Sequence, residues 1–516
     1  MLNKAKKIPT AAVIDIGSNE LRLHIAQALT DGEREGVKYL ESLHYPLSLG
    51  HDTFHVGKMR FDKVDKACDI INNFLVEAKG YGIRQLRTVA STAAREATNI
   101  NYILDQIKIK TGVTVEVMDE ADEKRHIYKL LSHYADENLK QSALMVYIGT
   151  GNIGVSLLKD GRIPRKWNIP VGSLRIWELF GQLQEYTREF HRLLEEYLTG
   201  FIQQVKTGIP EGVAHFIVCG QEIDMIAKLT RADSHSPLFT LPKERLLDLC
   251  EKIKYKTPER IASDFDLSIE KADSLMPVAS VLQNLLSLTQ AKTLTASLML
   301  PCDAVLFDML HPKRFTALEK WLTKSTKLSV RLLAERYHCD IAHGNQVCDQ
   351  ALAVFDKLKK LHGLGNRDKQ LLAAAAMLHE AGEYVNNRDH HIHSYNIVRA
   401  SDIVGLGAGE TEIVALICRY HSLLTPGEHD PCYAALDRGK KVRVSKLAAL
   451  LKLADALDRS YLQKFSQIEA KLFEGELVIT VHTQSNAALE QWAFGEKGQF
   501  FSEVFGLKAH LKVRKT

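Results

Sequence analysis

The chain lacks any apolar run long enough to cross a membrane. No stretch of its 516 residues approaches the ~18 consecutive apolar residues that a spanning helix requires. The basic residues 1–7 are followed by an apolar run that Asp15 soon interrupts, so we expect no secretory signal. These absences predict a cytoplasmic protein that has no membrane partner.

Closely spaced cysteine pairs are also missing. The eight cysteines are scattered, and none forms a C-x-x-C motif. Several lie in apolar runs, as buried free thiols of a reducing compartment do. The cysteine pattern therefore predicts neither a disulfide framework nor a zinc site.

The chain has no strong excess of either charge. Its net charge of +4 is small for this length. A local basic cleft is compatible with that balance, but a surface that coats nucleic acid is not. We therefore expect no specific nucleic-acid partner.

The length and the changes of pattern along the chain predict several domains. Residues 1–140 and 141–312 show alternating strands and helices, and residues 313–465 are mostly helical. Residues 466–516 have the pattern of a small α+β cap. The sequence does not indicate a task for this cap.

One stretch near the N-terminus gives the first indication of a functional site. Residues 11–27 read AAVIDIGSNELRLHIAQ, an apolar run that ends at Asp15, a turn at Gly17-Ser18-Asn19, and an alternating run. This pattern predicts two strands and a tight turn in which Gly17 and Asn19 adopt positive φ. A carboxylate beside backbone N–H groups suits phosphate and Mg²⁺ chemistry, although an ordinary hairpin turn has the same pattern.

The same shape occurs a second time. Residues 142–158 read SALMVYIGTGNIGVSLL, with a glycine-rich turn at Gly149-Thr150-Gly151-Asn152 between two apolar runs. Two units of strand, turn and strand, each with Ile-Gly at the turn, suggest a duplicated domain. We expect a cleft between the two halves.

Two further segments carry groups that suit anion chemistry. Ser91, Thr92 and Arg95 follow a strand and open a helix, which directs N–H groups and a guanidinium at an anion. A plain N-cap and a solvated charge would look the same. Residues 119–123 hold four carboxylates in five positions, which is typical of a solvated helix start. At the floor of an anion site, one of them would act as a general base.

Together these motifs resemble the exopolyphosphatase and guanosine pentaphosphate phosphohydrolase (Ppx/GppA) family, over nearly the whole chain. The matching segments are Asp15 to Glu20 followed by Arg22, Ala90 to Ala97, Asp122 to Arg125, Val171 to Arg175, and Lys271 to Asp273. The resemblance implies an α/β fold with a duplicated core like that of actin, Hsp70 and the sugar kinases, a ribonuclease H-like fold. It also implies a homodimer.

The resemblance also implies roles for particular residues. Glu123 takes the place of the family's catalytic base, and Arg22 and Arg95 would neutralise charge on the transferred phosphate. Asp15 would hold Mg²⁺. The expected phosphate-binding residues are those of the two turns: Gly17, Ser18, Asn19, Gly149, Thr150, Gly151 and Asn152.

The sequence departs from the family at the second turn. The family's loop carries two carboxylates that are implicated in metal binding, and here their positions are occupied by Tyr147 and Gly154. Neutral residues do not supply the anionic oxygens that Mg²⁺ prefers. We therefore expect a weakened Mg²⁺ site, which puts turnover in question more than anion binding.

The helical segment carries a constellation of its own. His343, His379-Glu380 and Asp455 fall on separate expected helices, the pattern of HD-type phosphohydrolases, in which four such side chains hold a divalent transition metal. The second motif reads His-Glu where that family has His-Asp. His390, His391, His393 and His421 are candidates for the same site. A helical scaffold that binds no metal is the alternative interpretation.

Three functional hypotheses follow. The first is hydrolysis of a terminal phosphoanhydride in inorganic polyphosphate or in guanosine penta- or tetraphosphate. The second is a binding protein for the same ligands whose catalytic site has degenerated. The third places the phosphohydrolase activity in the HD-like domain. No base-recognition pattern in the sequence distinguishes polyphosphate from nucleotide.

Overall fold

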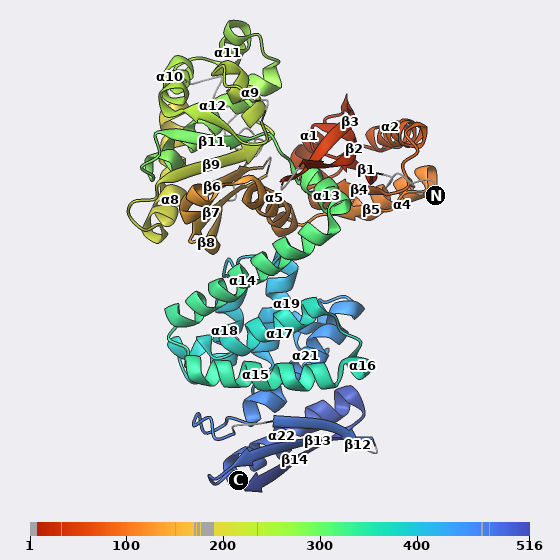
Figure 1. The fold of residues 1–516 in the computed structure, drawn as a ribbon, viewed down its shortest axis with the longest axis vertical. Coiled ribbons are helices and arrows are strands. Elements are labelled where there is room, and N and C mark those ends of the chain that lie inside the picture. The colour runs from red at the N-terminus through yellow and green to blue at the C-terminus, as the bar shows by residue number, and fades with distance from the viewer. Residues whose placement is uncertain are drawn as a thin grey trace, which may run out of the picture. The chain divides into compact units, whose positions relative to one another are not determined.

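The computed structural model describes the chain except for residues 1–7, 32–33, 150, 170–171, 173–175, 177–189, 235, 466–467, 474 and 516. The chain forms two compact units, residues 1–324 and 325–516 (Figure 1). Among the described residues, no helix is both long and apolar enough to cross a membrane. Boundaries after residues 140, 312 and 465 remain a proposal for how these units subdivide.

The first unit begins with a five-stranded sheet in the order β3-β2-β1-β4-β5. Its strands are β1 (Thr10–Ile16), β2 (Glu20–Asp31), β3 (Arg34–Pro46), β4 (Leu86–Ala90) and β5 (Val115–Val117). β1 is antiparallel to β2, which places Asp15 opposite Arg22, and parallel to β4. The apolar residues that alternate along β2 are buried in the core of this half, as the period of two predicts.

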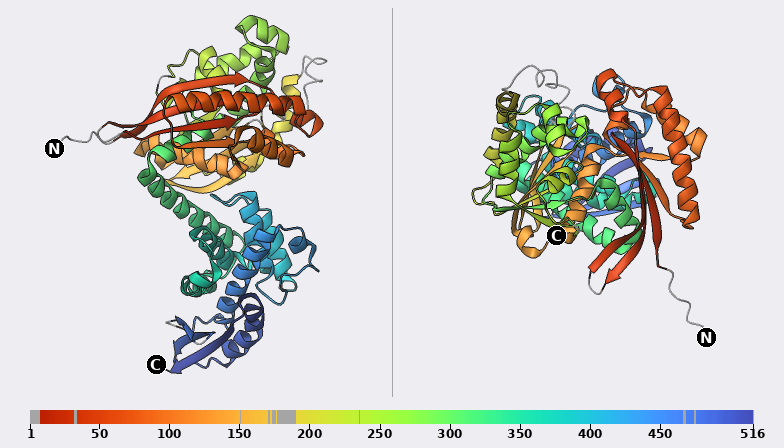
Figure 2. Two further views of the ribbon diagram at one scale, coloured as in Figure 1. Left: turned by 90° about the vertical axis from the view of Figure 1, so that its right-hand side faces the viewer. Right: turned by 90° about the horizontal axis from the view of Figure 1, so that it is seen from above.

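The second sheet has six strands in the order β10-β11-β9-β6-β7-β8. Its strands are β6 (Ser142–Ile148), β7 (Ile153–Lys159), β8 (Arg162–Ile169), β9 (His215–Gly220), β10 (Phe239–Pro242) and β11 (Thr293–Ser297). β6 is antiparallel to β7 and parallel to β9, as β1 is to β2 and β4. Figure 2 shows the two halves of this unit side by side. The duplicated α/β core predicted from the two turns is confirmed.

Helices cover both sheets of the first unit. They are α1 (Leu49–Val56), α2 (Phe61–Gly80), α3 (Thr92–Glu96), α4 (Ile100–Thr111), α5 (Glu120–Tyr134), α6 (Glu137–Gln141), α8 (Phe190–Gly208), α9 (Ile223–Leu229), α10 (Lys243–Ile253), α11 (Pro258–Phe265), α12 (Ile269–Ser287) and α13 (Pro301–Leu310). The next helix, α14 (Pro312–Arg336), begins in the first unit and ends in the second. α13 follows the second sheet in the chain but packs against β1 and β2 of the first sheet. It therefore connects the two halves.

The second unit combines helices with a small sheet. Its helices are α15 (Ile341–Lys357), α16 (Lys359–His362), α17 (Asn366–Leu378), the 3₁₀ helix η1 (Ala381–Tyr384), α18 (His390–Arg399), α19 (Ala408–Arg419), α20 (Pro431–Ala434), α21 (Arg438–Ala456) and α22 (Ala488–Phe505). β12 (Ile468–Phe473), β13 (Glu476–Thr483) and β14 (Lys508–Lys515) form the sheet. Helices and sheet share one hydrophobic core, in which α22 packs on α21.

Candidate functional site

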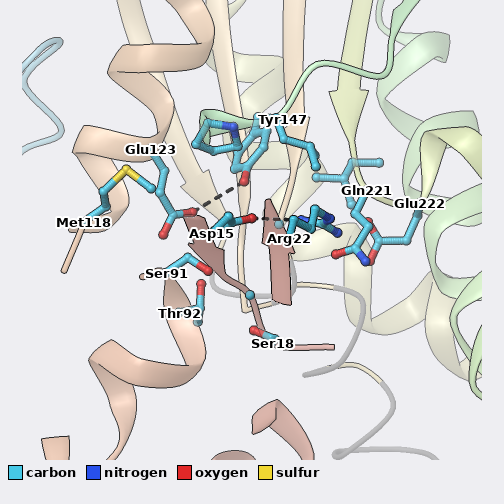
Figure 3. A pocket seen from close by; sticks show the side chains of 15 residues that line it. Asp15, Ser18, Arg22, Ser91, Thr92, Met118, Glu123, Tyr147, Gln221 and Glu222 are labelled. Atoms are coloured by element: carbon cyan, nitrogen blue, oxygen red, sulfur yellow. Dashed lines mark hydrogen bonds and ion pairs between the residues drawn. The ribbon is translucent and has the colours of Figure 1, made fainter. Parts of the chain in front are cut away.

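A pocket lies where the two halves of the first unit meet (Figure 3). Side chains reach it from the β1–β2 turn, the start of α3, α5, the end of β6, the segment after β9 and the start of α13. Its lining comprises Asp15, Gly17, Ser18, Arg22, Ser91, Thr92, Met118, Glu123, Tyr147, Ile148, Gly149, Gln221, Glu222, Leu300 and Pro301. The structure thus brings together residues from both halves at the carboxyl ends of the parallel strands, as expected for such sheets.

The two turns have the same backbone geometry. The Gly17 N–H donates to the Glu20 carbonyl at 3.1 Å, and the Gly149 N–H donates to the Asn152 carbonyl at 2.9 Å. A Cβ on either glycine would lie only 2.8 or 2.9 Å from that carbonyl oxygen. Glycine is required here by close backbone approach. The expectation of positive φ at Gly17 and Asn19 was wrong, because neither residue adopts it.

The expected phosphate-binding residues differ in their surroundings. Gly17, Ser18 and Gly149 line the pocket. Both glycine N–H groups are used within their own turns, so these groups shape the site and are not oriented toward a ligand. A Cβ on Gly151 would lie 3.0 Å from Thr92 Cγ2, so the second turn touches the first half. Asn152 is buried, Asn19 is half-buried, and Thr150 lies outside the described residues, as do Val171 and positions 173–175.

Asp15 and Arg22 form a buried ion pair. Arg22 Nη1 donates to Asp15 Oδ2 at 2.9 Å, and Nη2 donates to Glu20 Oε1 at 2.5 Å. Burial raises the pKa of Asp15, while the Arg22 guanidinium opposes that shift. Two carboxylates thus share the charge of Arg22, so this arginine positions Asp15 at the end of β1.

Glu123 lines the pocket and is held by Arg95, which is not itself among the lining residues. The residue is 4% exposed, and its Oε1 accepts a hydrogen bond from Arg95 Nη1 at 2.7 Å. Arg95 also donates to the Met118 carbonyl and to Thr92 Oγ1, which fixes the guanidinium. Burial raises the pKa of Glu123, and Arg95 opposes this. A carboxylate whose pKa is raised by burial accepts a proton more readily than an exposed one.

Tyr147 occupies a place in the pocket next to this glutamate. Its hydroxyl donates to Glu123 Oε2 at 3.4 Å, as Figure 3 shows. Burial raises the pKa of the phenol well above its usual value, so the group remains a neutral donor. Tyr147, at a position where the resemblance implies a carboxylate, therefore contacts the candidate base.

The side chain of Lys124 occupies the space beside Gly154. A Cβ on Gly154 would lie 2.5 Å from Lys124 Cε and 3.0 Å from the Tyr128 hydroxyl. The Lys124 ammonium binds Glu120 Oε1 at 2.5 Å and also contacts Asn168. The space that a longer side chain would take at position 154 is therefore occupied by a cationic side chain.

Several residues of the pocket were missed in the interpretation of the sequence. Met118, Gln221, Glu222, Leu300 and Pro301 all line it. Glu222 adds a carboxylate just beyond the end of β9, where Gly220 has a φ of +143°. That glycine at a strand end was the available signal. No motif in the neighbouring sequence indicated that Leu300 or Pro301 would line the pocket.

The second unit brings its four expected metal ligands together. Ligand atoms of His343, His379, Glu380 and Asp455 all lie within 4.8 Å of one another, and all four residues are buried. His343 Nε2 lies 3.3 Å from His379 Nε2 and 3.5 Å from Asp455 Oδ1. Of the other candidate histidines, His421 packs against His379, with 4.8 Å between the two ring centroids.

Each of these four side chains is also held by a second contact. His343 Nδ1 lies 2.9 Å from Asp458 Oδ2, and His379 Nδ1 lies 2.8 Å from the Ala376 carbonyl. Glu380 accepts from the Tyr461 hydroxyl, and Asp455 is paired with Lys497 of α22. The sequence interpretation missed Asp458, Tyr461 and Lys497. Contacts of this kind orient metal ligands and fix histidine tautomers.

Comparison with known proteins places both units in one family. Residues 30–313 match the model of the Ppx/GppA phosphatase family, and residues 326–492 match that of Ppx/GppA phosphatase, domain III. A guanosine-5'-triphosphate,3'-diphosphate pyrophosphatase of Photobacterium profundum is 20% identical over 453 residues, 86% of each chain. Its counterpart from Pseudoalteromonas translucida is 23% identical over 427 residues, 80% of each chain.

Solved structures show the same fold. The Ppx/GppA family member of Aquifex aeolicus superposes with a TM-score of 0.51 at 20% identity, over 59% of this chain and 99% of that chain. An exopolyphosphatase from Cytophaga hutchinsonii superposes with a TM-score of 0.50 at 19% identity, over 59% and 98% of the two chains. The family model covers more than half of the chain. The chain belongs to the Ppx/GppA phosphatase family.

Proposed function

We propose that the pocket hydrolyses the terminal phosphoanhydride bond of inorganic polyphosphate or of guanosine pentaphosphate. The observation that carries this proposal is the position of Glu123, a buried carboxylate that lines a polar pocket and is fixed by Arg95. The names of the relatives, pyrophosphatase and exopolyphosphatase, support the same bond type. Inorganic polyphosphate and guanosine pentaphosphate remain alternatives as the substrate.

The chemistry assigned to Glu123 is general-base catalysis. A water attacks the terminal phosphorus, Glu123 accepts a proton from it, and the bridging P–O bond breaks with its electrons leaving on the shortened chain. Arg95 lies against Glu123 and would neutralise charge on the transferred group, which is the main requirement of phosphoryl transfer. Arg22 acts through Asp15, because both of its contacts in the site are carboxylates.

The residues present fit a magnesium ion. Asp15, Glu123 and Glu222 all line the pocket, and carboxylate oxygens are the ligands that Mg²⁺ prefers. Asp15 and Glu222, one from each half of the unit, would hold the ion, and Glu123 is left to act as the base. When bound, Mg²⁺ supplies positive charge against the substrate phosphates. Glu222 compensates in part for the carboxylates that positions 147 and 154 lack.

Phosphate release from polyphosphate and from guanosine pentaphosphate, with and without Mg²⁺, tests this proposal. Glu123→Gln should lower kcat by ~10²–10⁴ with little change in ligand affinity. Glu137→Gln, at an exposed ion pair on α6, is the matched control and should leave kcat unchanged. Binding without release by the wild type would show that the protein is a binding protein for these ligands. An unchanged kcat in Glu123→Gln would remove that residue from the mechanism.

We also propose that the second unit holds a divalent transition metal, as HD-type domains do. Three buried carboxylates, Glu380, Asp455 and Asp458, lie against His343 of this cluster. Of the three, Asp455 is paired with an ammonium group in the described part of the chain, that of Lys497. A divalent cation would balance the two remaining negative charges. Two imidazoles with two carboxylates suit ions such as Zn²⁺, Mn²⁺ or Fe²⁺.

Metal analysis of the purified, loaded protein tests this second proposal. His379→Ala should abolish uptake at this cluster, while His429→Ala, which removes an exposed histidine of the same unit, should not. Polyphosphate binding should persist in both variants. Equal metal content in the two variants would favour a scaffold that binds no metal here.

We also propose that the protein is a homodimer, and light scattering of the purified protein tests this.

A further inference from the structure

A buried histidine of the first unit lacks a hydrogen-bond partner. His24 lies on β2 and is 8% exposed, and neither of its ring nitrogens makes a hydrogen bond within the described chain. The carboxylate oxygen Oδ1 of Asp303 is 3.5 Å from His24 Nδ1. Buried polar atoms of native proteins are nearly always paired, and an exception points to an ion or a water.

Two further ligand groups lie at the same place. Cys302 and Asp303, in the first turn of α13, are buried, and their ligand atoms lie with that of His24 within 4.8 Å of one another. The Asp303 carboxylate is fixed from both sides. Its Oδ1 accepts from the Tyr39 hydroxyl at 2.7 Å, and its Oδ2 accepts from the Leu300 N–H at 2.7 Å.

The donor set identifies the class of ion. An imidazole nitrogen, a sulfur and a carboxylate oxygen suit Zn²⁺ and related transition ions, whereas Mg²⁺ and Ca²⁺ prefer oxygen alone. Three protein ligands leave one position of a tetrahedral ion open. A coordinating thiol loses its proton to the solvent when such an ion binds.

We propose that His24, Cys302 and Asp303 bind a divalent transition ion of the Zn²⁺ class. The three ligands come from β2 and from α13, so the ion ties the first sheet to the helix that follows the second sheet. Leu300 and Pro301, immediately before the ligands, line the pocket. The ion therefore fixes one wall of the pocket and takes no part in the chemistry of Glu123. The proposal stands independently of the phosphohydrolase activity.

Cobalt substitution tests this site and separates it from the cluster of the second unit. Wild-type protein, reduced and stripped of metal, is titrated with Co²⁺ and followed by absorption. A thiolate-to-cobalt charge-transfer band is expected, because Cys302 supplies sulfur. The second-unit cluster has no sulfur ligand and contributes no such band. Absence of the band from folded wild-type protein would overturn the proposal and favour a bridging water.

Variants then assign the band to its ligands. Cys302→Ser should abolish it, and His24→Gln should weaken Co²⁺ binding at least tenfold, within the range seen when a contact around a metal ion is lost. His44→Ala is the matched control, because that partly exposed ring packs 5.7 Å from His24 without being a ligand. Cys68→Ser is the control for another buried thiol. A band that survives Cys302→Ser, or that His44→Ala reduces as much as His24→Gln does, would refute the assignment.

Should Cys302→Ser fail to fold, zinc content decides the question in a protein that already lacks the second-unit cluster. In the His379→Ala background, about one equivalent of Zn²⁺ should remain after loading and dialysis. Adding His24→Gln to that background should remove it, whereas adding His44→Ala should not. Equal zinc in the two double variants would overturn the proposal.

Discussion

The two turns that meet at the pocket share a backbone and differ in chemistry. In each, a glycine N–H closes the turn on a carbonyl three residues later, and a Cβ on that glycine would meet the same carbonyl. The first turn carries Asp15, paired with Arg22, whereas Tyr147 precedes the second turn and donates to Glu123. The duplicated fold thus determines where each turn places its side chains, but it does not determine the chemical type of those side chains.

This difference gives the two sides of the pocket unequal numbers of charged groups. Asp15, Arg22 and Glu123 line the pocket from the first half of the unit, and Arg95 of the same half holds Glu123. The second half contributes backbone, the Tyr147 phenol and Glu222. A catalytic role is therefore expected to depend chiefly on the first half, and the following variants test that expectation.

Among the variants that compare the two turns, the largest effect is expected for Asp15→Asn. The substitution leaves Arg22 with Glu20 as its carboxylate partner and removes one anionic oxygen from the proposed Mg²⁺ position. We expect kcat/KM to fall by ~10²–10³, the range for loss of one preorganised charged group. Steady-state phosphate release at several Mg²⁺ concentrations measures this. If Asp15→Asn lowered kcat/KM less than Tyr147→Phe does, catalysis would depend more on the second half of the unit than on the first.

A smaller effect is expected when either turn glycine gains a methyl group. Gly17→Ala and Gly149→Ala should each lower the free energy of unfolding by ~1–3 kcal/mol, because the new Cβ has no room beside the carbonyl. Gly200→Ala on α8, which has open space around it, is the control and should be neutral or stabilising. Urea unfolding of the three variants measures these changes. Unequal costs at positions 17 and 149 would show that the two turns are not equivalent.

The smallest effect is expected for Tyr147→Phe. Its hydroxyl donates to Glu123 over a long 3.4 Å contact, so kcat/KM on the plateau should fall by less than ~10-fold. The pH dependence is more informative. The hydroxyl stabilises the ionised carboxylate, so its loss should raise the pKa of Glu123 further and move the acid limb of kcat/KM to higher pH. A shift to lower pH would contradict this orientation of the hydrogen bond.

Local sequence pattern was sufficient to predict the two turns and the duplicated core. It also singled out Glu123 and Arg95, but it did not predict that the two side chains form an ion pair. Asp15 and Gly17 stand in one short motif, and Glu123 and Arg95 in two others. Positive φ at Gly17 was predicted wrongly, because a glycine required for close approach has the same local sequence as one required for its dihedral angle.

The remaining contacts join segments that no local pattern relates. Lys124 lies over Gly154, and Lys497 pairs with Asp455 across two helices of the second unit. His24 and Cys302 also meet through the tertiary fold alone. The prediction of no zinc site considered closely spaced cysteines alone, so it did not consider Cys302 as a metal ligand. Such contacts depend on packing, which short-range spacing does not encode.

The return of α13 onto the first sheet has a consequence for synthesis on the ribosome. β1 is made early, yet apolar residues of its outer face are buried against Cys302, Val305 and Leu306, which emerge almost 300 residues later. At ~5–20 residues per second, that face remains uncovered for on the order of tens of seconds. The nascent first half therefore presents an unprotected apolar surface, and chaperones that bind such surfaces should associate with it until α13 has left the exit tunnel.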